Sequence, residues 1–387
     1  MSRSVAIIGT RGYPSYYGGF ETAIRRLAPY LVDAGWDVTV YGRKGSVVEA
    51  DHSARPEIHS KFTFGLNSKS LSTLSFGATA SISTMLAKPD VALVMNVANG
   101  FFLPGLRARG IPTLMNVDGI EWDRAKWNRA AKAVFRAGAI LSARWADELV
   151  FDARAIGDRW QKDFNTRGTF IPYGGDLHGE LPTESGLDHR GYILLVARFV
   201  PENSVIQFFE AVPALADKWP VVIVGSDGFG GEFDAAARKL ADAQSNVTWL
   251  GHVSDDVRLR SLWQHAGAYF HGHSVGGTNP ALVQAMASGA PIVARDTVYN
   301  RETLGDGGMF VQATSDSVLD GIETMMQSSE RETYVTSAMQ RAGNYYSWDG
   351  VCEAYERSLC NLADQGANGA RKFDSTRALS LRKRRYD

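Results

Sequence analysis

The sequence predicts an α/β protein built from two doubly wound parallel-sheet domains. Short apolar runs alternate with segments of helical periodicity along the chain, which is the pattern of parallel strands joined by covering helices. The 387 residues suffice for two such domains with separate cores. Each half also contains a glycine-rich loop between a strand and a helix, the place where sheets of this kind bind ligands.

The first half opens with a predicted β-α-β unit. Residues 4–9 read as a buried strand, apolar residues recur at helical spacing over 20–31, and residues 36–41 read as the next strand. A polar stretch at 174–191 contains Pro182 and has no periodicity, so we take it as the linker between the domains. Further strands are predicted at residues 91–95, 113–116, 169–171, 192–196, 221–224 and 268–270.

The loop after the first strand argues against a dehydrogenase. A nicotinamide-binding fingerprint needs G-x-G-x-x-G directly after the strand. Here Gly9 and Gly12 have the wrong spacing and the loop is too long. We expect Gly18 and Gly19 instead to approach a ligand above the strand ends.

The loop at residues 273–279 is the most informative stretch of the chain. Asn279 suits the N-cap of a short helix and Pro280 suits its first position. Gly276 and Gly277 precede this helix, so backbone N–H groups and the positive end of the helix dipole would be open to an anion. The sequence therefore predicts a phosphate site here, the alternative being a plain loop-to-helix junction.

Composition excludes several classes of protein. The net charge of −1 gives no global field for nucleic acid, and 44% hydrophobic residues is ordinary for a soluble chain. Cys352 and Cys360 show no metal-ligand pattern and suggest a reducing compartment. The strand predicted at residue 4 leaves no room for a signal peptide, and the longest apolar run, 91–106, is interrupted and too short to span a bilayer. We expect a cytoplasmic protein.

The end of the chain is strongly basic. Residues 371–387 contain seven basic residues and two aspartates. A solvated tail is the simplest interpretation, and contact with anionic lipid at the inner face of the plasma membrane is the functional alternative.

Several stretches together carry a resemblance to a known family. They are residues 9–22, 116–122 with Arg124, Lys126 and Trp127, 171–176, 197–203, 276–280 and 299–302. In order and spacing they resemble the retaining glycosyltransferases of GT-B architecture in family 4, and within it a bacterial branch that includes rhamnosyltransferases of polysaccharide assembly. The resemblance covers nearly the whole chain.

The resemblance implies a GT-B fold, in which two Rossmann-like doubly wound domains face each other across a cleft. Residues 1–178 would form the acceptor-side domain and residues 190–346 the nucleotide-sugar-binding domain. In the GT-B plan a C-terminal helix, here 347–363, crosses back to complete the first domain. Residues 364–387 would form the basic tail.

The resemblance also implies which residues bind the donor, a nucleoside-diphosphate sugar. Arg198 corresponds to the family's diphosphate-binding arginine, although it could instead pair with Glu202 on the surface. Asn203 stands where the family carries a lysine. The remaining donor-binding candidates are Gly18, Gly19, His273, Gly276, Gly277, Thr278, Asn279 and Gln284.

This chain departs from the family at two glutamates spaced eight residues apart. Their places are taken by Gly276 and Gln284, and a glutamate frequent in the narrower branch is replaced by Ser274. Gln284 could still hydrogen-bond a sugar hydroxyl through its amide. The substitutions leave the identity of the donor open.

In retaining enzymes of this architecture the leaving phosphate itself is thought to help deprotonate the acceptor, so neither a dedicated base nor a metal ion or cofactor is implied. Asp118 is the candidate for catalytic contact together with Arg198, because it would lie at the carboxyl edge of the first sheet. Its alternative role is to stabilise a turn. Tyr17 and Glu121 are acceptor-side candidates.

Three function classes follow. The first is a transferase that moves a sugar, L-rhamnose by resemblance, to a glycan or lipid-linked acceptor in cell-surface polysaccharide biosynthesis. The second is a GT-B nucleotide-sugar epimerase, disfavoured by the missing carboxylates. The third is a catalytically weak nucleotide-sugar-binding partner of another transferase.

Overall fold

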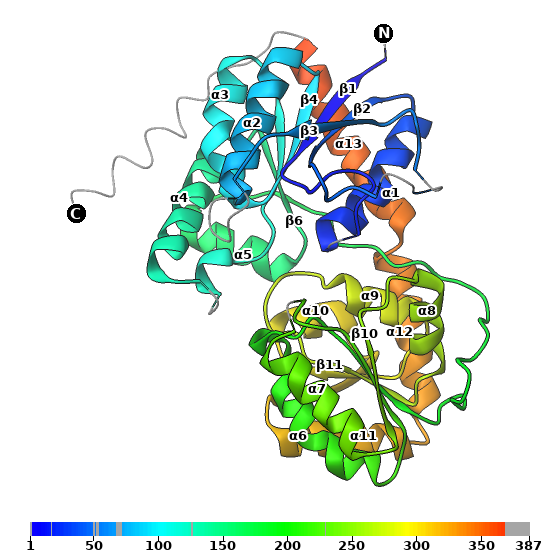
Figure 1. Cartoon of the computed structure of the whole chain (residues 1–387). Coiled ribbons are helices and arrows are strands. Elements are labelled where there is room, and N and C mark those ends of the chain that lie inside the picture. Colours follow the sequence, from blue (N-terminus) through cyan, green and yellow to red (C-terminus); the bar gives the residue numbers. More distant parts are fainter. Residues whose placement is uncertain are drawn as a thin grey trace.

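The computed structural model describes residues 2–16, 18–48, 51, 54–66, 72–124, 127–228 and 230–367. Two α/β domains lie one above the other, and each is a parallel sheet with helices on both faces (Figure 1). This architecture confirms the predicted fold class. Tyr17, Lys126 and the basic tail from residue 368 onward lie outside the described residues.

The first domain contains a seven-stranded sheet in the order β3-β2-β1-β4-β5-β6-β7. The sequence order changes direction at β1, which pairs in parallel with both β2 and β4. The strands are β1 (Ser4–Ile8), β2 (Asp37–Arg43), β3 (His59–Thr63), β4 (Val91–Met95), β5 (Thr113–Asn116), β6 (Glu148–Phe151) and β7 (Thr169–Phe170). β4 and β5 match the predicted strands at 91–95 and 113–116.

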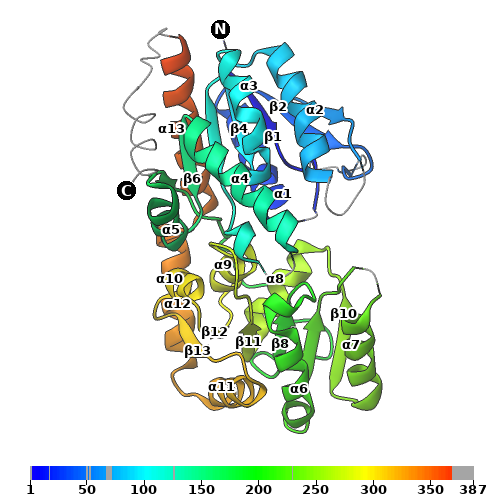
Figure 2. The ribbon, with the colours of Figure 1, turned by 90° about the vertical axis from the view of Figure 1, so that its left-hand side faces the viewer.

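The helices of the first domain pack on both faces of this sheet (Figure 2). They are α1 (Gly19–Asp33), α2 (Ser72–Ala87), α3 (Leu103–Ala108), α4 (Arg129–Trp145) and α5 (Arg154–Phe164), with two 3-10 turns, η1 (Val97–Phe102) and η2 (Glu121–Asp123). The C-terminal helix α13 (Trp348–Ala367) also lies here, because Val351, Tyr355 and Leu359 are buried in the same core as β1 and β4.

The second domain contains a six-stranded sheet in the order β10-β9-β8-β11-β12-β13. Its strands are β8 (Ile193–Val196), β9 (Val221–Val224), β10 (Val247–Gly251), β11 (Ala268–His271), β12 (Ile292–Arg295) and β13 (Gly308–Val311). Its helices are α6 (Val205–Ala216), α7 (Glu232–Ala243), α8 (Asp256–His265), α9 (Pro280–Ala287), α10 (Val298–Leu304), α11 (Ser315–Gln327) and α12 (Arg331–Tyr345), with the 3-10 turn η3 (Pro201–Asn203). Both sheet faces are apolar and covered, as parallel sheets require.

The chain passes between the domains at two places that lie side by side. Gly175 forms a parallel β-bridge with Ser347, and its N–H donates to the Tyr346 carbonyl over 2.8 Å. Gly174 packs directly against the ring of Trp348. Glycine is needed at residue 174 because a Cβ atom there would meet that ring.

Candidate active site

Two helix N-termini meet between the domains. A Cβ atom on Gly19, the first residue of α1, would lie 3.3 Å from Cγ of Pro280, the first residue of α9, and 3.4 Å from the Tyr173 hydroxyl. Asn279 caps α9, as predicted, by accepting a hydrogen bond from the Ala281 N–H over 3.0 Å. The positive ends of two helix dipoles therefore point into one space, an arrangement that favours an anion.

The two glycines of the 273–279 loop face different surroundings. Gly276 has φ +103°, and the one described group within 4 Å of a Cβ atom there would be the Arg124 guanidinium, at 3.8 Å. A Cβ atom on Gly277 would overlap the Asp152 carboxylate of the first domain. Packing against Asp152 is thus enough to require glycine at residue 277, and phosphate binding by the Gly277 backbone stays a prediction.

Asp152, which follows β6, ties the first domain to this loop. Its backbone carbonyl accepts hydrogen bonds from the Thr278 N–H, over 3.3 Å, and from the Thr278 hydroxyl. Thr278, a predicted donor contact, is thus already bonded through both groups. Burial and the nearby Asp118 carboxylate raise the pKa of Asp152 to about 8. Sequence reasoning missed this residue, although it follows a strand in the same way as Asp118.

Asp118 lies half-buried at the carboxyl edge of the sheet, where the sequence places it. Its backbone is left-handed, with φ +63°, and its N–H donates to Oδ1 of Asn116 over 3.0 Å. The side chain that stabilises this turn is therefore that of Asn116. Among the described residues, the Asp118 carboxylate accepts one side-chain hydrogen bond, from Asn96 over 3.2 Å.

Glu121, an acceptor-side candidate, is buried and engaged through both oxygens. One lies 2.7 Å from Nε of Arg124, and the other accepts a hydrogen bond from the Trp127 indole over 2.8 Å. Arg124 in turn extends to Gly119 and Gly276, and these two glycines bring the two domains into backbone contact. Glu121 therefore positions Arg124, the cation of the first domain that lies beside the 273–279 loop.

Arg198 is exposed on the loop after β8. Both it and Glu202 are described, and they form no ion pair, so the alternative surface pairing is absent. Asn203 is buried, and its amide donates to the Arg198 carbonyl over 2.8 Å. Asn203 thus holds the turn that carries Arg198 and does not itself reach outward.

His273 and His271 form a stacked pair with ring centroids 4.4 Å apart. Burial lowers the pKa of His271 well below its ordinary value. Burial, and then the positive charges of Arg198 and Arg124, lower the pKa of His273 to about 3. Both rings are therefore neutral at physiological pH. Asn300 fixes the loop by donating to the His273 carbonyl over 2.9 Å.

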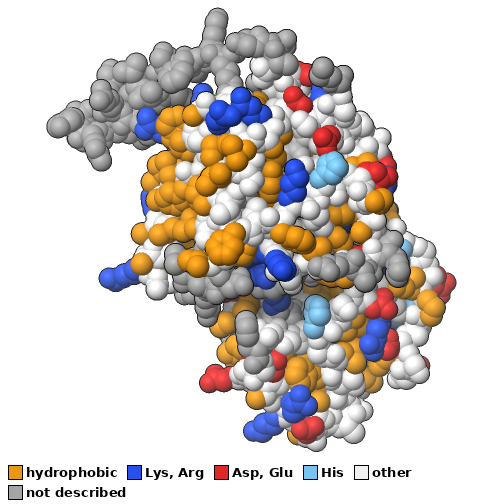
Figure 3. All heavy atoms as spheres, turned by 45° about the horizontal axis from the view of Figure 1, so that its top comes forward, with side chains coloured by type: hydrophobic (Ala, Val, Ile, Leu, Met, Phe, Trp, Pro, Cys, Tyr) orange, Lys and Arg blue, Asp and Glu red, His pale blue; other side chains and the backbone are white. Residues whose placement is uncertain are grey.

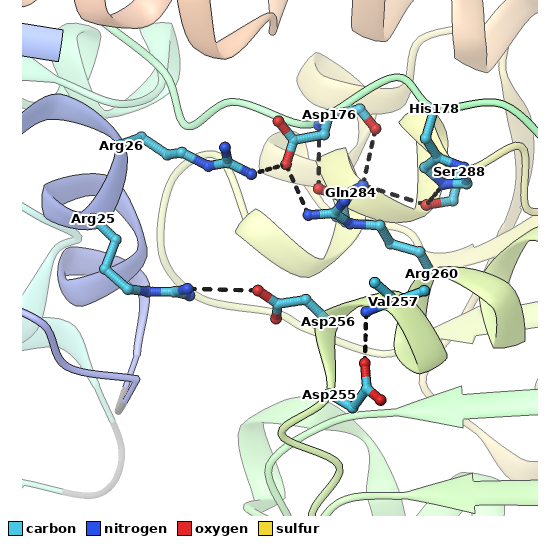
Figure 4. Close-up of polar contacts among 10 residues, drawn as sticks. All are labelled: Arg25, Arg26, Asp176, His178, Asp255, Asp256, Val257, Arg260, Gln284 and Ser288. Atoms are coloured by element: carbon cyan, nitrogen blue, oxygen red, sulfur yellow. Dashed lines mark hydrogen bonds and ion pairs between the residues drawn. The ribbon is translucent and has the colours of Figure 1, made fainter. Parts of the chain in front are cut away.

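Gln284 points toward the interdomain linker (Figure 4). Its carbonyl accepts from the Asp176 N–H over 3.2 Å, and its amide donates to the Asp176 carbonyl over 3.1 Å and to the Ser288 hydroxyl over 3.3 Å. Both ends of the side chain that was expected to bind the donor are therefore committed to the linker.

Charged contacts join the domains around the site. Arg26 of α1 and Arg260 of α8 both pair with Asp176, and Arg25 lies 3.5 Å from Asp256 (Figure 4). On the opposite side, the carboxylate of Glu302 on α10 accepts hydrogen bonds from the first N–H groups of α5, over 2.6 and 3.0 Å. Gly18, the N-cap of α1, has no side-chain cap.

Within the described ranges, no group of three or more His, Cys, Asp or Glu side chains could hold a metal ion. In the same part of the chain, no helix combines the length and the apolar character needed to cross a membrane.

Two family models match consecutive parts of the chain. Residues 18–174 match the model described as Glycosyl transferase 4-like domain, and residues 180–341 match Glycosyl transferases group 1. The second domain thus resembles the group 1 glycosyl transferases, and the first domain resembles a glycosyl transferase 4-like domain. The two models meet at the linker, between the two sheets.

Relatives of known name are distant. The chain is 26% identical to a phosphatidyl-myo-inositol mannosyltransferase of Mycolicibacterium smegmatis over 60% of its own length and 64% of the relative's. A protein of the same name from Mycobacterium leprae is 26% identical over 57% of this chain and 62% of the relative. The chain thus spans less than two thirds of these relatives.

Solved structures agree over almost the whole chain. Sucrose-phosphate synthase from Thermosynechococcus elongatus has a TM-score of 0.76 at 15% identity, covering 93% of this chain and 99% of that one. HepE of Anabaena, solved with UDP-glucose, has a TM-score of 0.71 at 13% identity, covering 93% of this chain and 100% of that one. These likenesses confirm the GT-B fold.

Proposed function

We propose that this protein transfers a sugar, with retention of configuration, from a nucleoside-diphosphate sugar to a glycan or lipid-linked acceptor. The observation that carries the proposal is the meeting of two helix N-termini, at Gly19 and Pro280, beside the open Gly276. Arg198 and Arg124 add positive charge on either side of the 273–279 loop. Diphosphates are anions that helix N-termini and guanidinium groups bind well.

The chemistry follows from where charge develops. When the bond between sugar and phosphate breaks, the diphosphate gains negative charge, and fixed dipoles and guanidinium groups stabilise that charge without rearranging. Asp118, whose carboxylate accepts a hydrogen bond from Asn96, is our candidate for contact near the reacting sugar. We expect transfer without a metal ion, because the cations are supplied by the chain.

The identity of the donor is part of the proposal. Two relatives are named mannosyltransferases that act on phosphatidyl-myo-inositol, HepE was solved with UDP-glucose, and the branch that the sequence resembles includes rhamnosyltransferases. We propose L-rhamnose as the sugar to test first and cell-surface polysaccharide assembly as the setting. A lipid-linked acceptor is consistent with the lipid substrate in the relatives' name.

Donor turnover tests the proposal directly. The protein would be incubated with nucleoside-diphosphate forms of L-rhamnose, D-mannose and D-glucose, and release of nucleoside diphosphate would be measured with and without acceptor, with and without chelator. We expect acceptor-dependent release with one donor, unchanged by chelator, and a product that keeps the donor's anomeric configuration. Conversion of the donor to a stereoisomer without release would instead identify an epimerase.

A second candidate function is a nucleotide-sugar-binding partner of another transferase. It is favoured by Gln284, whose amide is fully engaged with Asp176 and Ser288 at a place where the family carries a donor-binding glutamate. Donor binding by calorimetry with no release under any acceptor condition would support this candidate over transfer.

A further inference from the structure

One face of the first domain is unusually apolar. More than half of the exposed large hydrophobic side chains of the described residues lie on or beside β3, α2, η1 and α4. Phe64 and Leu86 are 80% and 77% exposed, and Ile82 and Ile140 are each at least half exposed. In a space-filling view, hydrophobic side chains gather over this domain, with Lys and Arg side chains around them (Figure 3). Contiguous exposed apolar surface of this kind marks an interaction site.

The elements that carry these side chains form one continuous surface. α2 packs against η1 and α3, and α4 packs against the same two elements. The segment after β3 is bonded to α2, because the Thr79 hydroxyl donates to the Phe64 carbonyl over 2.6 Å and the Leu66 N–H donates to Ser75 over 2.9 Å. We call this surface, formed by residues 62–66, α2, η1, α3 and α4, the α2–α4 face.

The charge on the α2–α4 face has one sign. α2, η1, α3 and α4 contain no aspartate or glutamate, and α2 contains no charged residue. α4 presents Arg129, Arg136 and Arg144 on its exposed side, next to Ile140. An apolar surface that carries only cations is complementary to an anionic lipid surface. A second copy of the same face would bring cations against cations, and so would the basic tail of the chain.

We propose that the α2–α4 face binds the surface of an anionic lipid bilayer, with Phe64, Ile82 and Leu86 inserted among the headgroups and the arginines of α4 against lipid phosphates. The bilayer contact would lie on the first domain, away from α6, α7 and α11 of the second. It would also present lipid-linked acceptors to the acceptor-side domain. That consequence rests on the proposed function, whereas lipid binding itself does not.

Vesicle sedimentation tests the proposal. Full-length protein would be spun with vesicles of phosphatidylglycerol and phosphatidylcholine, and with phosphatidylcholine alone, over a range of salt. We expect binding to the anionic vesicles. The double variant Ile82→Glu/Leu86→Glu should weaken it at least about tenfold. Arg136→Glu/Arg144→Glu should also weaken it at least about tenfold, with the difference shrinking as salt rises.

The matched control is Ile206→Glu/Tyr345→Glu, which places the same charges at exposed apolar positions of the second domain and should bind vesicles like the unaltered protein. Circular dichroism would verify that each variant is folded, and nucleoside diphosphate release with a soluble acceptor would report transfer separately. A protein truncated after residue 370 would show how much of the vesicle binding comes from the tail and how much from the α2–α4 face.

The proposal would be overturned if the face variants bound vesicles as well as the unaltered protein, or if the unaltered protein did not bind them. A change of oligomeric state in the face variants without loss of lipid binding would overturn it in favour of a second copy.

Discussion

Arg198 lies on the loop after β8 with no carboxylate of the described residues within ion-pair distance, so its charge is available to an anion. We predict that Arg198→Ala raises the donor KM and lowers kcat together, because the lost contact strengthens as the phosphate gains charge. A charge-assisted hydrogen bond contributes about 1.5–3 kcal/mol, which corresponds to about a tenfold to hundredfold loss. Steady-state kinetics would measure the loss, with Lys239→Ala, an exposed cation on α7, as the control. Equal kinetics in the two variants would contradict the assignment.

Titration of the Asp152 carboxyl group makes the free energy of unfolding depend on pH. Burial raises the pKa of Asp152 to about 8, so the folded state holds a proton that the unfolded state loses near pH 4. Its contribution to stability is therefore fully present below about pH 4 and is lost as pH rises toward about 8. We predict that Asp152→Asn flattens the decline of the free energy of unfolding between pH 5 and 8, by about 1–3 kcal/mol. Denaturant unfolding at several pH values would show it, and parallel curves for the two proteins would argue against it.

Variants at residue 277 can distinguish a packing role of Gly277 from a role in ligand binding. Gly277→Ala would force its Cβ atom into the Asp152 carboxylate, and we predict a lower melting temperature and weaker donor binding. Asp152→Ala/Gly277→Ala removes the obstacle and should recover the melting temperature and donor affinity of Asp152→Ala alone. If calorimetry found donor affinity lost in the double variant while the melting temperature recovered, Gly277 would be a glycine for the ligand after all.

Helix α5 begins with a cap that comes from the other domain. Glu302 on α10 accepts hydrogen bonds from the Arg154 and Ala155 N–H groups, and its negative charge lies at the positive end of the α5 dipole. We predict that Glu302→Ala lowers the free energy of unfolding by about 1–2 kcal/mol. Glu353→Ala, which breaks an exposed pair with Arg357, should change it by less than about 0.5 kcal/mol. Chemical unfolding measures both, and a loss in Glu302→Ala no greater than the control's would show that the cap is unimportant.

The elements that the sequence predicted well are those whose evidence is local. The cap at Asn279, the proline at residue 280 and the strands at 91–95 and 113–116 depend on neighbouring residues or on a run of apolar side chains. The exposed edge strand β3 carries no such apolar run and was not predicted, and β6, β10, β12 and β13 were not predicted either.

The intramolecular bonds of the site residues that the sequence could not foresee depend on distant partners. Gln284 bonds to Asp176, 108 residues away, and Thr278 bonds to Asp152, 126 residues away. A side chain suited to a ligand is equally suited to a backbone group, and only the folded chain shows which of the two it meets.

At the scale of the whole molecule, the order of the chain does not follow the division into domains. The first domain is completed by α13, whose buried residues include Val351 and Leu359, yet these residues follow the entire second domain in sequence. The two crossings between the domains are bonded to each other through Gly175 and Ser347.

A break in the backbone would therefore not divide this molecule into its domains. If a protease cleaved at the exposed Ser185–Gly186 bond, the amino-terminal fragment would lack the helix that fills its core, and that helix would remain attached to the carboxyl-terminal fragment. Each fragment would need the other to bury its apolar surface. We expect the nicked protein to elute as a single species in size exclusion and to separate only in denaturant. The same interlocking makes residues 185–186 a natural place to split the chain into two halves that reassemble when they are produced together.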